Sequence, residues 1–389
     1  MMHSLSPSSA ALESVSFGEH QFQFLPTGAS ALDTLISRID AAQRSICLEM
    51  YIFRADATGD RVRAALLSAR QRGLPVFMVL DHFGSGDLPR HHFDELQKAG
   101  AHIRFFNPSR VLRVAFRNHR KLCVIDDRIA IVGGFNVGDE YAGDGVHAGW
   151  RDLGLEISGP LIVELQRSFY RMFSAARMDR KAFTFISRGR YRHAPSLDRP
   201  ALLTAGPGFG GALMRRALYR DLLGSRRVSV VAAYFAPTWT MRRRLSKAAK
   251  QGSVQLILAG KSDVQILRMA AQHLYSRLLR DGVRIAEFQP QILHTKLFVI
   301  DDVVYVGSCN LDVRSLRLNF ELLVRIPCPA LAEQARVLFA ADLKQSIQVA
   351  SEEWTSKTGR WEKMKRRVAY WMVMRLDPFL ARRRLKSLR

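Results

Sequence analysis

Two segments of the chain carry the same reactive side chains at the same spacing. Each has the form His-x-Lys-x4-Asp, and the second starts 175 residues after the first. A short glycine-containing turn follows both and leads to an asparagine. The shared set is His119, Lys121, Asp126 and Asn136 in the first copy, and His294, Lys296, Asp301 and Asn310 in the second. Because one imidazole can act as a nucleophile and another as a general acid, the duplication predicts a single composite site for phosphodiester chemistry.

The other polar members of the set fit the same chemistry. We expect Lys121, Lys296, Asn136 and Asn310 to hold the non-bridging phosphate oxygens and to stabilise charge in the transition state. The two ammonium groups supply positive charge, and no cluster of acidic and histidine residues has metal-ligand spacing, so we expect no metal and no other cofactor. A lone histidine would more simply be a satisfied core or surface residue. Its repetition with a lysine two positions later favours the catalytic interpretation.

The motif residues are expected to lie on β-hairpins. An apolar run, an acidic turn and a second apolar run follow each lysine. Residues two apart in a strand point to the same side, so each histidine shares a face with its lysine. Asp126 and Asp301 belong to the candidate catalytic motif, but their place at the turn predicts that they brace the hairpin and do not touch substrate.

The elements around the motifs repeat in the two halves. Helix stop signals and β-branched runs predict helix, strand, helix, strand, helix and strand ahead of each motif hairpin. The predicted elements are 31–42, 45–53, 60–72, 75–80, 93–99 and 102–106 in the first half, and 212–223, 228–235, 241–251, 254–258, 265–280 and 283–288 in the second. This repeat predicts an α/β protein of two similar domains, each a mixed β-sheet flanked by helices, with the active site at their interface.

Domain boundaries follow from this repeat and from the charge pattern. Seven arginines and lysines against two aspartates between 177 and 199 indicate a basic linker, although an ordinary solvated loop explains them equally well. The predicted units are 1–175 for the first domain, 176–204 for the linker, 205–345 for the second domain and 346–389 for a basic amphipathic tail.

With these motifs in place, the chain resembles the phospholipase D superfamily, and most closely its bacterial cardiolipin synthase branch. The resemblance covers roughly residues 20–345 and is carried by the segments 132–141, 150–152 and 307–321. It departs at the N-terminus, where no membrane-spanning helix is predicted, so the chain resembles the type without such helices. The resemblance implies that His119 forms a phosphohistidine and that His294 protonates the leaving group, an order that the two near-equivalent motifs do not fix by themselves.

The resemblance also implies partners for the histidines. Each imidazole needs a carboxylate that fixes its tautomer and orientation. Asp152 in Trp-Arg-Asp and Glu321 in Leu-Asn-Phe-Glu occupy the positions that the family uses for this purpose. Independently of the resemblance, Glu49 and Tyr234 stand in equivalent strands of the two halves, and we expect both to line the cleft.

The charge of the chain indicates an anionic partner. With 59 Lys and Arg against 35 Asp and Glu, the net charge is +24, which suits nucleic acid or an anionic membrane and does not choose between them. No secretion signal and no apolar stretch of 18 residues stands out. The four cysteines form no Cys-x-x-Cys pair and are expected to be buried, reduced thiols of a cytoplasmic protein.

The last 33 residues carry twelve of these basic residues and two acidic ones. Trp361, Met364, Val368 and Trp371 fall at helical spacing among them, which predicts a helix that lies in an anionic membrane interface. A nucleic-acid-binding tail, or a helix that covers the protein's own core, are the alternatives.

These features favour a phosphatidyltransferase that moves a phosphatidyl group from phosphatidylglycerol to the hydroxyl of another phospholipid. A phospholipase D-type lipid hydrolase and a metal-independent nuclease are the alternatives. We expect a peripheral protein on the cytoplasmic face of the bacterial inner membrane, with anionic phospholipids as partners, no stable protein partner and no nucleic acid.

Overall fold

The structure is a computed structural model that describes residues 12–107, 116–176, 196, 198–207, 212–356 and 359–376. Most of the predicted basic linker lies outside the described residues. Within them, no helix has the length and apolar character needed to cross a bilayer.

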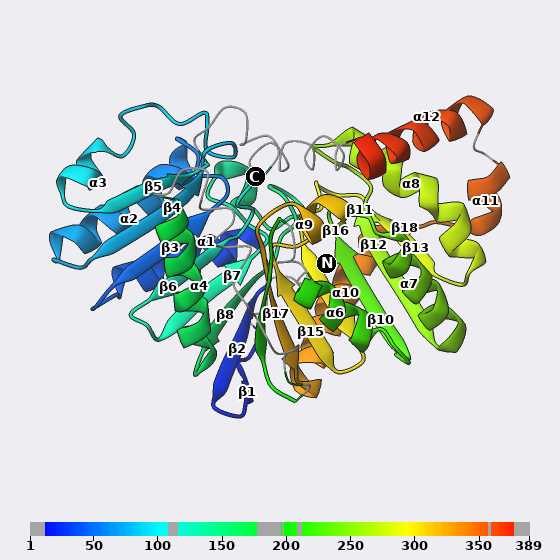
Figure 1. Ribbon diagram of the computed structural model, residues 1–389, viewed down its shortest axis with the longest axis horizontal. Helices are drawn as coiled ribbons and strands as arrows, with labels where there is room; N and C mark the ends of the chain where they lie inside the picture. The colour runs from blue at the N-terminus through cyan, green and yellow to red at the C-terminus, as the bar shows by residue number, and fades with distance from the viewer. Residues whose placement is uncertain are drawn as a thin grey trace, which may run out of the picture.

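The first half builds an eight-stranded mixed sheet with helices on both sides (Figure 1). The strand order is β1-β2-β8-β7-β6-β3-β4-β5, in which β3, β4 and β5 run parallel and β6, β7 and β8 are antiparallel. The elements are β1 (Val15–Phe17), β2 (His20–Leu25), α1 (Gly28–Asp40), β3 (Ile46–Met50), α2 (Ala57–Gln71), β4 (Val76–Asp81), α3 (Asp94–Lys98), β5 (His102–Phe106), β6 (Leu122–Ile125), β7 (Ile129–Gly133), the 3-10 turn η1 (Asp139–Tyr141), β8 (Gly154–Ser158) and α4 (Leu161–Ala175).

The second half builds another eight-stranded sheet, in the order β18-β13-β12-β10-β14-β15-β17-β9. Six strands of each sheet correspond, since β5-β4-β3-β6-β7-β8 and β13-β12-β10-β14-β15-β17 follow the same path. The elements are β9 (Ala201–Ala205), α6 (Ala212–Asp221), β10 (Arg227–Ala232), β11 (Phe235–Ala236), α7 (Trp239–Gln251), β12 (Ser253–Ala259), α8 (Gln265–Arg280), β13 (Arg284–Phe288), β14 (Lys296–Ile300), β15 (Val303–Gly307), β16 (Leu311–Asp312), α9 (Val313–Arg317), β17 (Glu321–Pro327), α10 (Pro329–Lys344), β18 (Ser346–Gln348), α11 (Ser351–Ser356), α12 (Arg360–Trp371) and the π-helical turn η2 (Met372–Leu376).

A shared core joins the two halves. Apolar side chains of α4 and α10 pack together with the inward-facing residues of both sheets, while each half has a separate core under its outer helices. Successive residues of β6 pack into different cores, because side chains alternate along a strand. Leu122 and Val124 pack into the shared core, whereas Cys123 and Ile125 pack into the outer core of the first half. Burial on both faces explains why the motif strands read as continuous apolar runs. The prediction of two similar α/β units with mixed sheets is confirmed.

The two ends of the second unit differ from the predicted boundaries. Residues 201–205 form β9, which pairs with β17, so the end of the predicted linker belongs to the second sheet. Likewise β18 pairs with β13, and α12 packs along α8. The described residues 346–356 and 359–376 are therefore an integral part of the second half and do not form a separate tail.

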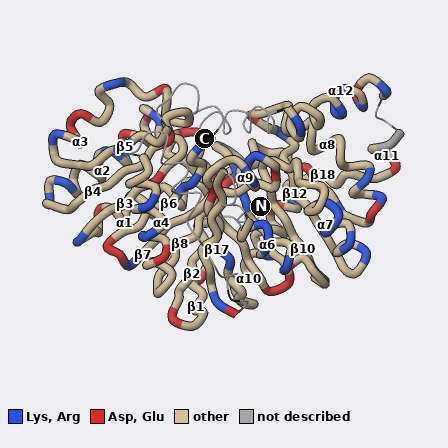
Figure 2. The backbone as a smooth tube through the Cα atoms, viewed as in Figure 1, with Lys and Arg blue, Asp and Glu red and all other residues tan. Residues whose placement is uncertain are grey.

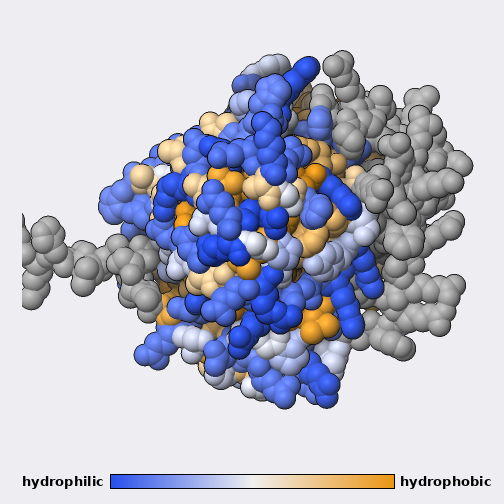
Figure 3. All heavy atoms as spheres, turned by 90° about the vertical axis from the view of Figure 1, so that its left-hand side faces the viewer, coloured by the Kyte–Doolittle hydropathy of each residue, from blue (hydrophilic) through white to orange (hydrophobic). Residues whose placement is uncertain are grey.

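The surface combines dispersed charge with isolated apolar groups. Figure 2 shows Lys and Arg over both halves and along α12. Figure 3 shows the outer face of the first half, around α2 and α3, as predominantly hydrophilic with scattered apolar side chains. Scattered apolar side chains of this kind are normal for a solvent-exposed protein surface.

Candidate active site

Each motif histidine lies against the opposite half of the chain. His119 stands just before β6, and its backbone N–H donates to the carbonyl of Phe320 at 2.9 Å. His294 stands just before β14, and its N–H donates to the carbonyl of Arg151 at 2.8 Å. Parallel bridges join Asn118 to Phe320 and Arg151 to Leu293. These two equivalent contacts bring both motifs to one interface.

The same contacts decide which carboxylate serves which histidine. The His119 Nδ1 atom lies 3.1 Å from Glu321 Oε2, and the His294 Nδ1 atom lies 2.6 Å from Asp152 Oδ2. Each carboxylate therefore serves the histidine of the other half, although Asp152 follows His119 in sequence and Glu321 follows His294. An ionised carboxylate accepts from Nδ1–H, which leaves the Nε2 atom of each ring unprotonated and available for chemistry.

The residues that directly follow β7 and β15, Gly134 and Ser308, contact the carboxylates of Asp152 and Glu321 in different ways. A Cβ atom at Gly134 would lie 2.3 Å from Asp152 Oδ1, so only glycine leaves room for that carboxylate. Its counterpart Ser308 donates its hydroxyl to Glu321 Oε2 at 2.5 Å. Asn319 adds a bond to Glu321 Oε1 at 3.3 Å. Burial nevertheless dominates and raises the pKa of Glu321 to about 7.

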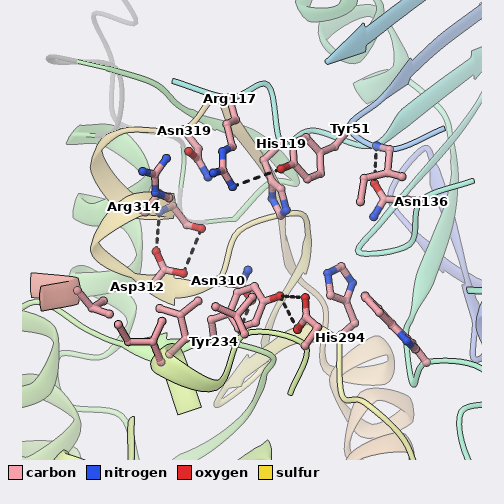
Figure 4. Close-up of a pocket in the computed structure, with 18 of the residues that line it drawn as sticks. Tyr51, Arg117, His119, Asn136, Tyr234, His294, Asn310, Asp312, Arg314 and Asn319 are labelled. Carbon is pink, nitrogen blue, oxygen red and sulfur yellow. Dashed lines mark hydrogen bonds between the residues drawn. The ribbon is translucent and has the colours of Figure 1, made fainter. Parts of the chain in front are cut away.

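The histidines face each other across a cavity of about 520 Å³ (Figure 4). Aromatic rings enclose both of them: Tyr51 lies 4.8 Å from His119 between ring centroids, and Tyr141 and Trp150 lie 5.4 and 5.5 Å from His294. The remaining lining residues are Ile52, Arg54, Arg117, Asn136, Glu140, Tyr234, Asp263, Val264, Ile266, Leu267, Asn310, Asp312, Arg314, Ser315, Asn319, Met372, Val373 and Leu376.

The imidazoles are held in the neutral form. Burial, followed by the charges of Lys121 and Lys296, lowers the pKa of His119 well below 6.5. Burial and Lys296 also lower the pKa of His294, but the adjacent Asp152 carboxylate opposes them. Burial and the charge of Lys296 thus favour the neutral form of both imidazoles.

The two lysines lie beneath the histidines and are almost fully buried. Lys121 Nζ donates to the backbone carbonyl of His119 at 2.7 Å, and Lys296 Nζ donates to that of His294 and lies 2.8 Å from its Nδ1. Burial lowers the pKa of Lys296 to about 8, and burial and the charge of Lys296 lower the pKa of Lys121 well below 10.5. Neither ammonium lines the cavity, so their contact with phosphate oxygens stays a prediction.

Both asparagines line the cavity in equivalent ways. The side-chain oxygen of Asn136 accepts from Ile52 N at 3.0 Å, and that of Asn310 accepts from Tyr234 N at 3.3 Å. With the oxygen fixed, the amide nitrogen is the group left to face a substrate. The Asn136 nitrogen is buried and has no hydrogen-bond partner of normal geometry in the described part of the chain.

Asp126 and Asp301 lie away from the cavity. Asp126 accepts from the backbone N–H groups of Gln43, Arg44 and Ser45 at 2.7–3.1 Å. Asp301 accepts from two consecutive N–H groups at 226 and 227, at 3.0 and 2.8 Å. Both aspartates have positive φ, 56° and 47°, at the tip of the hairpin. These bonds fasten each motif hairpin to the loop before the neighbouring strand.

The expectation for Glu49 is wrong. Its carboxyl is fully buried below the cavity, where it contacts Arg120 at 3.0 Å and accepts from Asn118 Nδ2 at 2.8 Å. Glu49 is not among the residues that line the cavity, whereas Tyr51, two positions further along the chain, is. Tyr234 does line the cavity, and its hydroxyl donates to Asp263 at 2.8 Å (Figure 4).

Sequence reasoning missed most of the cavity wall. Tyr51 and Arg117 lie in loops next to strands, and Arg314 lies in the short helix α9, so no periodicity marks them. Arg117 donates to the hydroxyl of Tyr51 at 3.3 Å. Tyr141 and Trp150 belong to the segments that carry the resemblance, which was the one signal available for them. Among the described residues, no group of three or more His, Cys, Asp and Glu side chains is arranged to hold a metal ion.

Comparison with known proteins identifies this architecture. A family model described as "Cardiolipin synthase, PLD-like domain" matches residues 35–172 and 220–343. Cardiolipin synthase A of Pseudomonas putida (strain W619) is 31% identical over 358 residues, which span 90% of the chain and 74% of that protein. The major cardiolipin synthase ClsA of Bacillus subtilis (strain 168) is 29% identical over 360 residues, with the same two shares.

A solved structure supports the fold. Phosphatidylserine synthase of Haemophilus influenzae Rd KW20 superposes with a TM-score of 0.71 at 13% identity and covers 94% of the chain and 93% of its own. The duplicated motif, the composite cavity and the match across both halves lead to one assignment. The chain belongs to the phospholipase D superfamily and, within it, to the cardiolipin synthase family of phosphatidyltransferases.

Proposed function

We propose that the protein transfers a phosphatidyl group from phosphatidylglycerol to the hydroxyl of a second phosphatidylglycerol, which yields cardiolipin and free glycerol. The observation that carries the proposal is the pair of buried, neutral imidazoles that face each other across one cavity. The names of its relatives, which are cardiolipin synthases, support the choice of substrate.

In the first step His119 Nε2 attacks the phosphorus of the donor lipid. A neutral nucleophile avoids repulsion by the anionic phosphodiester. The bond from phosphorus to the glycerol oxygen breaks, and that oxygen takes a proton from Nε2 of His294, which the bound phosphate anion helps to keep protonated. Glycerol leaves, and the phosphatidyl group stays on His119 through a P–N bond.

In the second step the hydroxyl of the acceptor lipid gives its proton to His294 Nε2. The oxygen attacks phosphorus, the P–N bond breaks, and its electron pair returns to His119. Asn136 and Asn310, which line the cavity, would hold the non-bridging oxygens, and the positive charges of Lys121 and Lys296 would favour the negative charge that develops there. Water in place of the alcohol would give phosphatidic acid, so exclusion of water separates transfer from hydrolysis.

We place this reaction at the cytoplasmic face of the bacterial inner membrane, without a stable protein partner. All four cysteines are free and buried, which suits a reducing compartment. The apolar part of the cavity wall suits a lipid better than a nucleic acid.

Mass analysis of the products tests the proposal. Purified protein is incubated with phosphatidylglycerol vesicles, with and without chelator. We expect cardiolipin and glycerol in equal amounts under both conditions, and no product from His119→Ala or His294→Ala. His102→Ala, which removes an exposed imidazole on β5, is the matched control and should stay active. Phosphatidic acid as the main product would indicate a hydrolase, and cleavage of DNA or RNA without cardiolipin would indicate a nuclease.

A further inference from the structure

Helix α12 exposes an apolar stripe to solvent. The stripe comprises Trp361, Met364, Val368 and Trp371, which are 68, 54, 49 and 55% exposed. Their spacing puts them on one side of the helix. The opposite side is occupied, because Ala369 is buried and the ring of Tyr370 packs at a tilt against that of His273 on α8, with 4.9 Å between the ring centroids. The stripe therefore does not cover the protein's own core.

The stripe is continuous with the wall of the active-site cavity. α12 runs directly into η2, whose Met372, Val373 and Leu376 line that cavity. Residues 264, 266 and 267, at the start of α8, complete an apolar wall on the same side. One unbroken segment thus joins an exposed apolar surface to the chamber that holds the histidines.

Positive charge surrounds the stripe. Residues 359–376 contain six Lys or Arg and a single acidic residue, Glu362. Arg360, Lys363, Lys365 and Arg367 are exposed. An anionic membrane surface attracts basic residues close to it, and Trp side chains favour the interfacial zone. Nucleic acid would use the charge but not the aliphatic and aromatic side chains between the charges.

From this geometry we infer that the stripe inserts into the interface of an anionic phospholipid bilayer, and that the acyl chains of a bound lipid run along η2 between the bilayer and the cavity. This inference rests on the proposed function for the identity of the bound lipid. It means that the headgroup reaches the histidines while the chains need not leave the membrane. The occupant of the stripe is the bilayer itself, and not a second copy of the chain.

Vesicle binding tests the inference without requiring turnover. The variant Trp361→Glu/Trp371→Glu is compared with Trp239→Glu, a tryptophan on α7 that is equally exposed at 56%. In flotation with phosphatidylglycerol vesicles we expect the double variant to bind at least tenfold more weakly and the control to bind like the unaltered protein. Equal binding by the double variant would overturn the inference. Because no product is measured, the result is independent of whether the protein makes cardiolipin.

A second measurement covers the case in which the double variant fails to fold. Vesicles whose acyl chains carry bromine should quench the tryptophan fluorescence of the unaltered protein. Trp361→Phe/Trp371→Phe keeps the stripe apolar, so it should bind vesicles normally and lose most of that quenching. Unchanged quenching would place the membrane contact elsewhere. A concentration-dependent dimer in sedimentation velocity that only the Glu variant abolishes would assign the stripe to a second copy and would also overturn the inference.

Discussion

Replacing Glu321 by glutamine should separate stability from catalysis. The carboxyl is fully buried and accepts bonds from Ser308 and Asn319 besides its contact with His119. Burial raises its pKa from the ordinary 4.5 to about 7. The folded chain therefore binds this proton more tightly than the unfolded chain. The stability that the group contributes is fully present below pH 4.5 and is lost as the pH rises through about 7.

The magnitude follows from the size of the shift. About 2.5 pKa units correspond to about 3 kcal/mol that is required to keep Glu321 ionised in the folded state at pH 8. Glutamine carries no charge at any pH and avoids this penalty. With an unfolding entropy of about 2.1 cal/mol/K per residue, a stabilisation of about 3 kcal/mol in 389 residues raises the melting temperature by about 4 °C. At pH 5 the native Glu321 is already protonated, so most of the difference should disappear.

Activity should change in the opposite direction. The glutamine amide would donate to His119 Nδ1, which moves the ring proton to Nε2, the atom that must attack. We expect kcat to fall by about a thousandfold or more. Native activity should rise with pH through about 7, as Glu321 ionises, and the variant should lose this dependence. Thermal melts at pH 5 and pH 8, with Glu19→Gln in the exposed β1–β2 turn as control, complete the test. A variant that is destabilised equally at both pH values, or that keeps activity within tenfold, would refute the reasoning.

Three further changes probe the supports of the site. Asp126→Ala removes the acceptor for three backbone N–H groups, so we expect about 1–3 kcal/mol of destabilisation in thermal melts but less than a tenfold change in kcat. Gly134→Ala pushes against the Asp152 carboxylate and should lower kcat about a hundredfold with little loss of stability; wild-type kinetics would contradict the close contact. Arg151→Met leaves the carboxylate of Asp342 buried without its 2.6 Å partner and should cost about 3–5 kcal/mol, which a second change, Asp342→Leu, should largely restore.

The repeated elements could be predicted because local signals agree with the fold. The helix predicted at 265–280 coincides with α8, and the predicted strand 45–53 contains β3. The turn aspartates could also be predicted from the sequence, because Asp126 ends an apolar run. These features depend on residues near each other in sequence.

The crossed pairing could not be predicted, because it depends on how two similar halves meet. His119 and Glu321 are 202 residues apart, and a pairing with Asp152 in the same half fits the spacing equally well. Glu49 was placed in the cleft because its strand was correct, but the correct strand does not show whether a given residue along it reaches the cavity. For α12, the stripe was evident from its period, whereas its packing along α8 requires the tertiary structure.

The central claim is that His119 is the nucleophile of a site completed by His294, and covalent trapping tests it directly. The variant His294→Ala is mixed with phosphatidyl-p-nitrophenol, a donor whose leaving group departs without a proton. Protease digestion and mass spectrometry then locate the phosphatidyl group. We predict a phosphatidyl adduct on His119 that accumulates because no base activates the acceptor, and no adduct in His119→Ala. An adduct on His294 in His119→Ala, or none in either variant, would contradict the account.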